Sequence, residues 1–183
     1  MVITIVIILL SAADQLIKAL VRGNLTASDR IPVIDGFFYI IYRENRGAAW
    51  SFLAGPEWGI YILSGLSLIM TIVLALLLIR IRHTGLRVCL TMIISGSIGN
   101  LIDRVRLGAV TDYLDFHFGS YVFPTFNLAD SLIVVGTALL CLLLLQTPHL
   151  IDLLIPDKNT KTDQSGTEAE KKEEPHAPAH PDN

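Results

Sequence analysis

Residues 58–79 read WGIYILSGLSLIMTIVLALLLI, a stretch with no charged side chain. A helix needs about 20 predominantly apolar residues to cross the roughly 30 Å of hydrocarbon in a lipid bilayer. This stretch therefore predicts a transmembrane helix. It also decides the fold class, because a chain with such a segment belongs in a membrane.

Three further apolar segments lie on either side of it, at 2–21, 86–102 and 130–146. The composition agrees: 52% of the 183 residues are hydrophobic and the mean hydropathy is +0.55, whereas soluble domains have roughly 45–50% apolar residues. The sequence predicts four transmembrane helices in one membrane domain, residues 1–156. The last two segments are short, which suggests helices whose outer ends are buried in protein or lie near the interface.

The tail, residues 157–183, has a different composition. It holds seven acidic and four basic residues, which account for the whole net charge of −3. Such a polar segment cannot bury apolar surface, so it is predicted to be a disordered cytoplasmic tail. The rest of the chain is neutral and offers no basic surface for nucleic acid.

The orientation follows from the link between the second and third segments. Arg80, Arg82, His83 and Arg87 make this link basic, and it has no acidic residue. Basic links stay in the cytoplasm, so both termini are predicted to be cytoplasmic. The two long loops, 22–57 and 103–131, then face outward. Residues 1–13 could instead be a cleavable signal peptide, but no Lys or Arg precedes Lys18, and a signal peptide needs a positive start.

The two outer loops have the pattern of β structure. Ile31–Ile34 and Phe37–Tyr42 flank an Asp35-Gly36 turn, and Val110–Phe116 and Tyr121–Phe123 form a second possible hairpin. The predicted fold is thus a membrane all-α protein with a small β element. Its four transmembrane helices carry a β-rich platform outside the cytoplasm.

Polar residues gather where three of the predicted helices meet these loops. A charged group at the centre of a membrane helix costs at least about 2.5–3.5 kcal/mol, so such groups are candidates for function. Two carboxyl groups held together share one proton, and such a pair can hydrolyse a peptide bond by acid/base catalysis. Spacing does not show which two would pair. The set is Asp14, Gln15, Lys18, Asn100, Asp103, Arg104, Asp112, Asn127 and Asp130.

Structural explanations exist for several of these residues. Asp14 and Lys18 stand four apart on one helical face, so they could simply neutralise each other. Asn127 has the place of a helix N-cap, with Asp130 at the third helical position. Gly96, Asn100 and Asp103 share one helical face and could hold helices together.

Other residue types give no sign of a metal or redox site. His117 has no second His or Cys at metal-ligand spacing and is interpreted as a loop residue. Cys89 and Cys141 lie in apolar runs, where a thiol is usually a small hydrophobic residue. No metal or cofactor is expected.

Four ordered segments resemble the sequence boxes of bacterial lipoprotein signal peptidase, also called signal peptidase II. Each alone is a weak pattern, but the ordered set is very specific, and the resemblance extends from about residue 5 to about residue 146. The segments are Asp14-Gln-Leu-Ile-Lys18, Asn45-Arg-Gly-Ala-Ala-Trp-Ser51, Gly99-Asn-Leu-Ile-Asp-Arg104 followed by Gly108-Ala-Val-Thr-Asp-Tyr113, and Phe126-Asn-Leu-Ala-Asp130.

The resemblance implies an aspartic endopeptidase of the bacterial cytoplasmic membrane, with Asp112 and Asp130 as the catalytic pair at the outer face. Its substrates would be prolipoproteins with a diacylglyceryl-modified cysteine, cut just before that cysteine. Its partners would be these substrates and membrane lipids, and we expect a monomer. The residues implied to shape or support the site are Asp14, Lys18, Asn45, Gly47, Asn100, Asp103, Arg104, Asn127 and Ala129.

Two positions depart from the family pattern. Trp50 stands where Phe is common, and Thr111-Asp112-Tyr113 replaces the commoner Val-Asp-Phe; both keep size and aromaticity. Rival functions are less consistent with the sequence. An ion-coupled transporter calls for repeated halves or broken helices, and Gly96-Ser97-Ile98-Gly99 is not the nucleophile motif of a serine intramembrane protease. A purely structural subunit leaves the polar residues unexplained.

Overall fold

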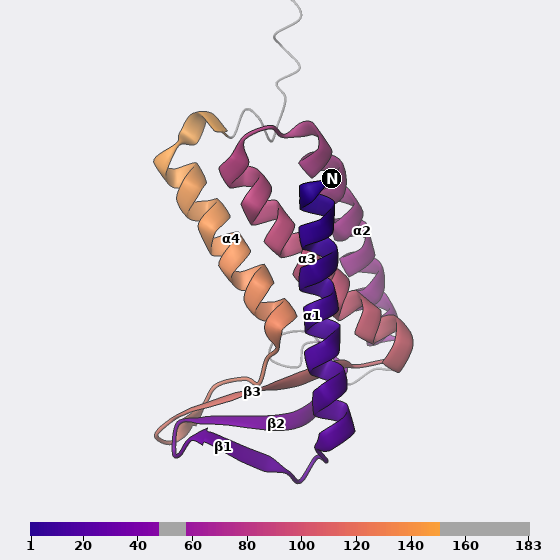
Figure 1. Ribbon diagram of the computed structural model, residues 1–183, viewed down its shortest axis with the longest axis vertical. Helices are drawn as coiled ribbons and strands as arrows, with labels where there is room; N and C mark the ends of the chain where they lie inside the picture. Colours follow the sequence, from indigo (N-terminus) through magenta and orange to yellow (C-terminus); the bar gives the residue numbers. More distant parts are fainter. Residues whose placement is uncertain (48–57, 151–183) are drawn as a thin grey trace, which may run out of the picture. The chain divides into compact units, whose positions relative to one another are not determined.

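The computed structural model describes residues 1–47 and 58–150, and within them four long helices run side by side (Figure 1). They are α1 (Val2–Asn24), α2 (Gly59–Arg80), α3 (Thr84–Leu107) and α4 (Leu128–Gln146). Each is long and apolar enough to cross a membrane. The predicted fold class, with four transmembrane helices, is confirmed.

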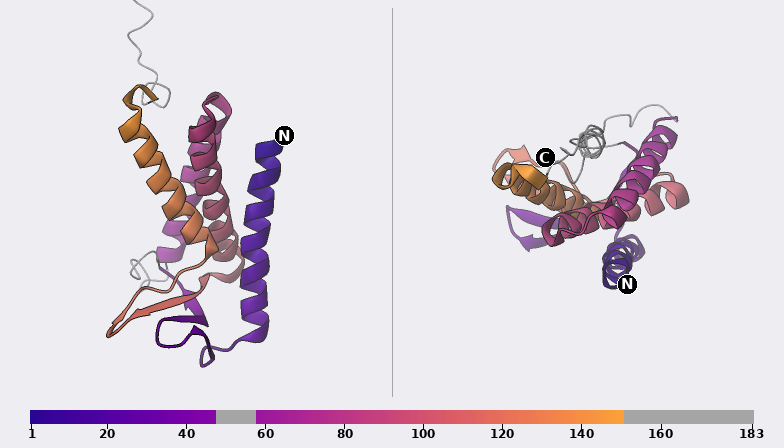
Figure 2. Two further views of the ribbon diagram at one scale, coloured as in Figure 1. Left: turned by 60° about the vertical axis from the view of Figure 1, so that its left-hand side comes forward. Right: turned by 90° about the horizontal axis from the view of Figure 1, so that it is seen from above.

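Helix α3 is longer than the predicted segment 86–102 and is not a short span. The reason is that α3 is the central helix, packed against α1, α2 and α4 (Figure 2). Of its most apolar stretch 56% is buried in the protein, against 17% for each of the other three helices. Its polar residues therefore face protein and not lipid, so apolarity alone does not define where it ends.

Glycines allow close packing of α3 against α4. A Cβ atom added to Gly96 would lie 2.3 Å from the carbonyl oxygen of Ala129, and one added to Gly136 would lie 3.0 Å from that of Cys89. Such contacts permit no larger residue unless a helix moves. Small residues let membrane helices approach closely, and Gly96 of α3 and Gly136 of α4 do so here. The predicted contact of the Gly96 face of α3 with another helix fits this geometry.

A small antiparallel sheet lies at the end of the bundle where α1 ends and α4 begins (Figure 1). Its strands are β1 (Arg30–Ile34), β2 (Phe38–Asn45), β3 (Val110–Phe118) and β4 (Tyr121–Val122), in that order. The predicted β element is thus present. The sequence suggested two separate hairpins, but β2 also pairs with β3, so the two loops form one sheet.

Local details of the sheet differ from the predicted segments. Phe37 belongs to the turn, where its N–H donates to the carbonyl of Ile34 beside Gly36 at φ 74°. Strand β3 runs two residues further than predicted and includes His117, which is not a loop residue. A 3-10 helix, Pro148–Leu150, follows α4. Residues 48–51 of the second sequence box, with Trp50, and the tail 157–183 lie outside the described residues.

Candidate active site

Asp112 lies in β3 and is almost completely buried, with 1% of its surface exposed. Asn45 on the neighbouring strand β2 donates from Nδ2 to its Oδ2 at 3.0 Å. Asn127, which caps α4, donates from Nδ2 to its Oδ1 at 2.7 Å. Burial, followed by the charge of Asp130, raises the pKa of Asp112 to about 7.

Asp130 lies in the first turn of α4. The Asp130 N–H donates to Asn127 Oδ1 at 2.9 Å, and the Asn127 N–H donates to Asp130 Oδ2 at 3.2 Å, which is a capping box. Asn100 on α3 donates from Nδ2 to Asp130 Oδ1 at 2.7 Å. The prediction that Asn127 is the N-cap of this helix is thus confirmed. It does not exclude a role in chemistry, because the same cap holds Asp130 near Asp112.

Asn127 is the element that connects the two aspartates. Its carbonyl oxygen accepts from the backbone of Asp130, while its amide nitrogen donates to Asp112 and, at 3.3 Å, to Asn100 Oδ1. Asn127 is completely buried. Asn127 therefore contacts both carboxyl groups: its side-chain amide binds that of Asp112, and its backbone N–H binds that of Asp130.

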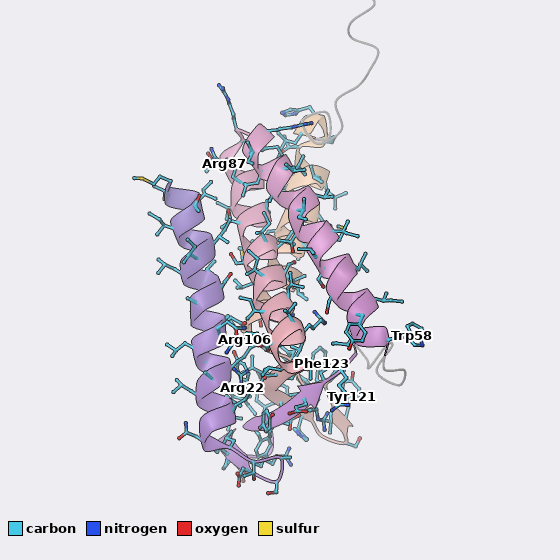
Figure 3. The ribbon with its side chains drawn as sticks, turned by 90° about the vertical axis from the view of Figure 1, so that its right-hand side faces the viewer. Arg22, Trp58, Arg87, Arg106, Tyr121 and Phe123 are labelled. Atoms are coloured by element: carbon cyan, nitrogen blue, oxygen red, sulfur yellow. The ribbon has the colours of Figure 1, made fainter. Side chains whose placement is uncertain are left out.

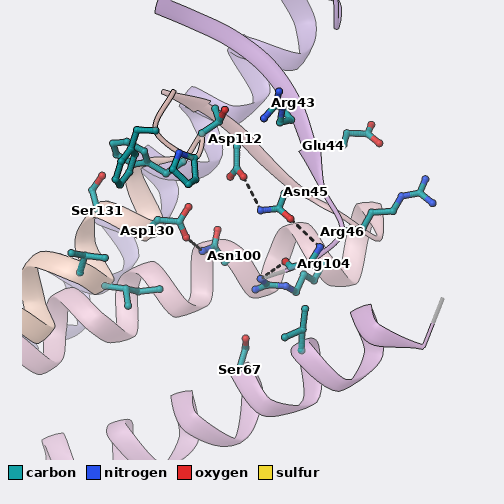
Figure 4. Close-up of a pocket in the computed structure, with 18 of the residues that line it drawn as sticks. Arg43, Glu44, Asn45, Arg46, Ser67, Asn100, Arg104, Asp112, Asp130 and Ser131 are labelled. Carbon is teal, nitrogen blue, oxygen red and sulfur yellow. Dashed lines mark hydrogen bonds between the residues drawn. The ribbon is translucent and has the colours of Figure 1, made fainter. Parts of the chain in front are cut away.

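Both aspartates line a cavity of about 960 Å³ (Figure 4). Asn45, Asn100 and Arg104 are among the polar residues of its lining. The apolar walls come from α2 and α4 and include Leu63, Leu66, Ile133, Val134 and Val135. The cavity thus combines two carboxyl groups with a wall suited to hydrocarbon.

Arg104 and Gly47 meet at the edge of this cavity. The Nη2 atom of Arg104 is 3.5 Å from the Gly47 carbonyl oxygen, and the Gly47 N–H donates to Asn45 Oδ1 at 2.9 Å. Through Asn45 this chain of contacts reaches Asp112 (Figure 4). Arg104 also places a positive charge beside the two aspartates.

Asp14, Lys18 and Asp103 form a separate buried cluster. Lys18 Nζ is completely buried, 2.9 Å from Asp14 Oδ2 and 3.2 Å from Asp103 Oδ2. It also donates to Asn100 Oδ1 at 3.0 Å. Asp14 accepts from the Ala129 N–H at 3.0 Å. None of these three residues lies in the lining of the cavity. The cluster therefore contacts the site only through Asn100 and the start of α4.

Some contacts around this cluster were not predicted. Gln15 donates from Nε2 to Asp103 Oδ1 and to the Gly99 carbonyl, both at 3.0 Å. Arg22, at the end of α1, donates to Thr111 Oγ1 at 2.8 Å. The Thr111 N–H in turn donates to Asp103 Oδ2 at 3.0 Å. In the sequence, Ser11, Asp14 or Gln15, Lys18 and Arg22 recur at a spacing of three or four residues. This spacing indicates a polar face on α1 and could have predicted these contacts.

A further polar cluster lies in the sheet, and its members Arg30, Asp115 and His117 are outside the cavity lining. Asp115, 5% exposed, accepts from Arg30 at 3.2 Å and lies 2.8 Å from His117 Nε2. Arg30 also stacks over the Tyr39 ring at 3.7 Å. The alternation of Asp115 and His117 along β3 was the signal for this cluster. It links β1 to β3.

Comparisons with known proteins agree with one another. The family model described as signal peptidase (SPase) II matches residues 6–146. A lipoprotein signal peptidase of Clostridioides difficile is 45% identical over 144 residues, 77% of this chain and 93% of that protein. One of Bacillus pumilus is 40% identical over 153 residues, 81% of this chain and 89% of that protein.

Solved structures show the same fold. A bacterial membrane enzyme determined by the in meso method at 2.3 Å resolution superposes with a TM-score of 0.72 at 29% identity, covering 79% of this chain and 88% of that chain. Another, determined at 1.9 Å resolution, gives a TM-score of 0.69 at 30% identity, covering 80% and 94%. With the matched family model and relatives of this identity, the chain belongs to the signal peptidase II family and is a multi-pass bacterial membrane protease.

Proposed function

We propose that this chain is an aspartic endopeptidase that removes signal peptides from diacylglyceryl-modified prolipoproteins and cuts just before the lipidated cysteine. The observation that carries the proposal is that the carboxyl groups of Asp112 and Asp130 line one cavity and are both hydrogen-bonded to one residue, Asn127. The other two buried carboxylates of the site region, Asp14 and Asp103, contact Lys18 instead.

The two aspartates would act as one acid/base pair. One ionised carboxyl group takes a proton from water, and the water oxygen attacks the scissile carbonyl carbon. The protonated partner donates its proton to the carbonyl oxygen. In the second step the proton taken from water passes to the leaving nitrogen and the C–N bond breaks. One hydroxyl group of the intermediate returns its proton to the partner carboxylate, which leaves a carboxyl product and restores the pair. The raised pKa of Asp112, about 7, is consistent with a pair that holds one proton near neutral pH.

The cavity walls suggest how the lipid on the substrate is used. The apolar side chains of α2 and α4 adjoin the two aspartates. Acyl chains attached to the cysteine can lie against these walls or in the bilayer while the peptide bond reaches the carboxyl groups. Recognition of the lipid would place the bond before the cysteine at the catalytic pair.

The remaining predicted residues would position or polarise this pair. Asn45, Asn100 and Asn127 hold the carboxyl groups by hydrogen bonds. Arg104 stabilises the negative charge of the pair, and Gly47 connects Arg104 to Asn45. Asp14, Lys18 and Asp103 anchor Asn100 and the start of α4, where Ala129 donates to Asp14.

The site would face outward. Figure 3 shows Arg87, in the first turn of α3 next to the basic link, at the opposite end of the helices from Tyr121 and Phe123 beside the sheet. If the basic link is cytoplasmic, the sheet and the aspartates are outside. A reporter fused after Arg82 should then behave as cytoplasmic and one inserted near Asp29 as external. The opposite result would overturn the orientation.

The activity can be tested with purified protein in detergent. Cleavage of a diacylglyceryl-modified prolipoprotein, and failure on the same protein without the lipid, is the expected result. Asp115→Asn is a matched control, because Asp115 is a buried aspartate of the same strand outside the cavity. It should retain cleavage while Asp112→Asn abolishes it. Equal cleavage of lipidated and unlipidated substrate would contradict the proposed substrate class.

A further inference from the structure

The first turn of α4 is held by three different parts of the protein. N–H groups at the start of a helix have no partner within the helix. In α4 the Leu128 N–H donates to Tyr113 Oη at 3.1 Å, and the Ala129 N–H donates to Asp14 Oδ1 at 3.0 Å. The Asp130 N–H donates to the capping Asn127 at 2.9 Å. Strand β3, helix α1 and the cap of α4 each contribute one acceptor.

Tyr113 has a special place among these acceptors. It follows Asp112 directly in β3, and Leu128 precedes Asp130 by two residues. The hydrogen bond from Leu128 to Tyr113 therefore joins the two segments that carry the aspartates, next to both of them. The Tyr113 side chain is buried, with 4% exposed. Burial raises its pKa to about 12, so the phenol is neutral at any working pH.

A phenylalanine would fill the same space without this bond. Tyr and Phe have the same aromatic ring and nearly the same size. The hydroxyl oxygen is what differs, and the structure gives it a definite partner. Backbone hydrogen bonds already pair Phe126, just before α4, with Tyr113 and Leu114 of β3. The Tyr113 hydroxyl extends this contact by a side-chain bond to the first residue of α4 itself.

We propose that Tyr113 is a positioning residue whose hydroxyl fixes the start of α4 against β3 and so sets the separation of the Asp112 and Asp130 carboxyl groups. The consequence for the reaction rests on the proposed function of the pair. Asn127 and the backbone pairing of Phe126 with β3 are further links between the same segments. Loss of the Tyr113 hydroxyl should therefore increase the separation of the two carboxyl groups slightly but leave both of them in the cavity.

This role predicts an effect that simple stabilisation would not produce. Two neighbouring carboxyl groups titrate in two steps, and the steps move further apart as the groups come closer. If α4 moves away from β3, the coupling weakens and the two macroscopic pKa values approach each other. The bell-shaped dependence of rate on pH should become narrower.

The test compares Tyr113→Phe with Tyr39→Phe. Tyr39 is a matched control, because its hydroxyl accepts from the Gly36 N–H in an exposed turn of the same sheet. For Tyr113→Phe we expect kcat to fall roughly threefold to tenfold, the rate equivalent of one neutral hydrogen bond, with KM unchanged and a narrower pH profile. Tyr39→Phe should show none of these changes. An unchanged kcat and profile in Tyr113→Phe would overturn the proposal, even if its Tm falls.

A second variant separates positioning from the cost of an unpaired N–H group. Proline at the first helical position has no N–H, and the residue before it must be extended. Asn127 is extended, with φ −136° and ψ −179°. The double variant Tyr113→Phe/Leu128→Pro should therefore recover Tm while kcat stays low. Recovery of kcat together with Tm would show that the hydroxyl only satisfies an amide, which overturns the proposal.

A measurement without substrate distinguishes this inference from the proposed function. Carboxyl groups of 13C-labelled aspartate can be titrated by NMR in wild type and Tyr113→Phe. A smaller gap between the two titration steps in the variant supports positioning even if the wild type cleaves no prolipoprotein, a result that would refute only the proposed function. An identical titration in both proteins overturns the positioning role whatever the activity.

Discussion

Two pairs of aspartates lie close together in the protein and have different surroundings. Asp14 and Asp103 both contact the buried Lys18 ammonium group, and Arg22 lies 3.7 Å from Asp103. Asp112 and Asp130 are held by amides, and they line a cavity. A carboxylate beside a cation is stabilised as an ion, whereas a carboxyl group held by amides near a like charge can keep its proton. We therefore infer a structural role for the first pair, whereas the second is the proposed catalytic pair.

Asn100 joins the two pairs. Its Oδ1 accepts from Lys18, and its Nδ2 donates to Asp130. The ammonium group thereby fixes which way the amide points, since it can only donate. Through Asn100, the Lys18 cluster thus orients a hydrogen-bond donor toward Asp130, one member of the proposed catalytic pair, without facing the cavity.

The largest effect should come from the catalytic pair. Asp112→Asn and Asp130→Asn keep the side-chain size but remove the titrating group, so each should lower kcat about ten-thousandfold or more, and the double variant should be scarcely worse. Single-turnover cleavage assays measure this. A chelator should leave the wild-type rate unchanged, because the pair itself supplies acid and base. Substantial cleavage by either single variant would remove the distinction between the two pairs.

The structural pair should respond in stability as well as activity. Asp14→Ala leaves Lys18 with Asp103 as its anionic partner and frees the Ala129 N–H. Removal of one member of a buried ion pair costs about 3 kcal/mol. We therefore expect a lower yield and Tm together with lower activity. An Asp14→Ala protein of normal Tm that is wholly inactive would place Asp14 with the catalytic residues.

The dependence of the free energy of unfolding on pH should further distinguish Asp112 from the aspartates that contact Lys18. The pKa of Asp112 is about 7 in the folded protein and about 4 in an unfolded chain. Between these values the folded state binds more protons, so Asp112 lowers the free energy of unfolding as the pH rises from about 4 to about 7. Asp112→Asn should therefore raise Tm in detergent at pH 8 and change it little at pH 4. Equal shifts at both pH values would contradict the raised pKa.

The smallest effect on cleavage should come from deleting the C-terminal tail, which contains neither pair of aspartates. Removal of residues 157–183 deletes a polar tail with none of the site residues. Membrane insertion and cleavage should be almost unchanged. A stably expressed truncation that no longer cleaves its substrate would show that the two pairs do not make up the whole functional apparatus.

The sequence predicted the features that depend on local pattern. Residues 58–79 identify a membrane helix because apolar length is a local property, and Asn127 with Asp130 identifies a capping box for the same reason. The pairing of β2 with β3 was not predicted, because it joins loops separated by two helices. Spacing alone also could not tell the Lys18-bound carboxylates from those at the cavity. The partner of the Tyr113 hydroxyl was missed because it comes from another element.

The central position of α3 has a consequence for how the protein is made. Of the four helices α3 is the least apolar and the most enclosed by protein, and its polar residues find their partners on α1, α4 and β3. As it leaves the ribosome and enters the bilayer, α1 and α2 are already present, but α4 is still to be synthesised. During that interval Asn100 is exposed to lipid or to the insertion machinery without Asp130 or Asn127. The polar groups of α3 should therefore be fully satisfied only when α4 has been inserted. The same step would bring Asp130 beside Asp112 and end the contact of α3 with the insertion machinery.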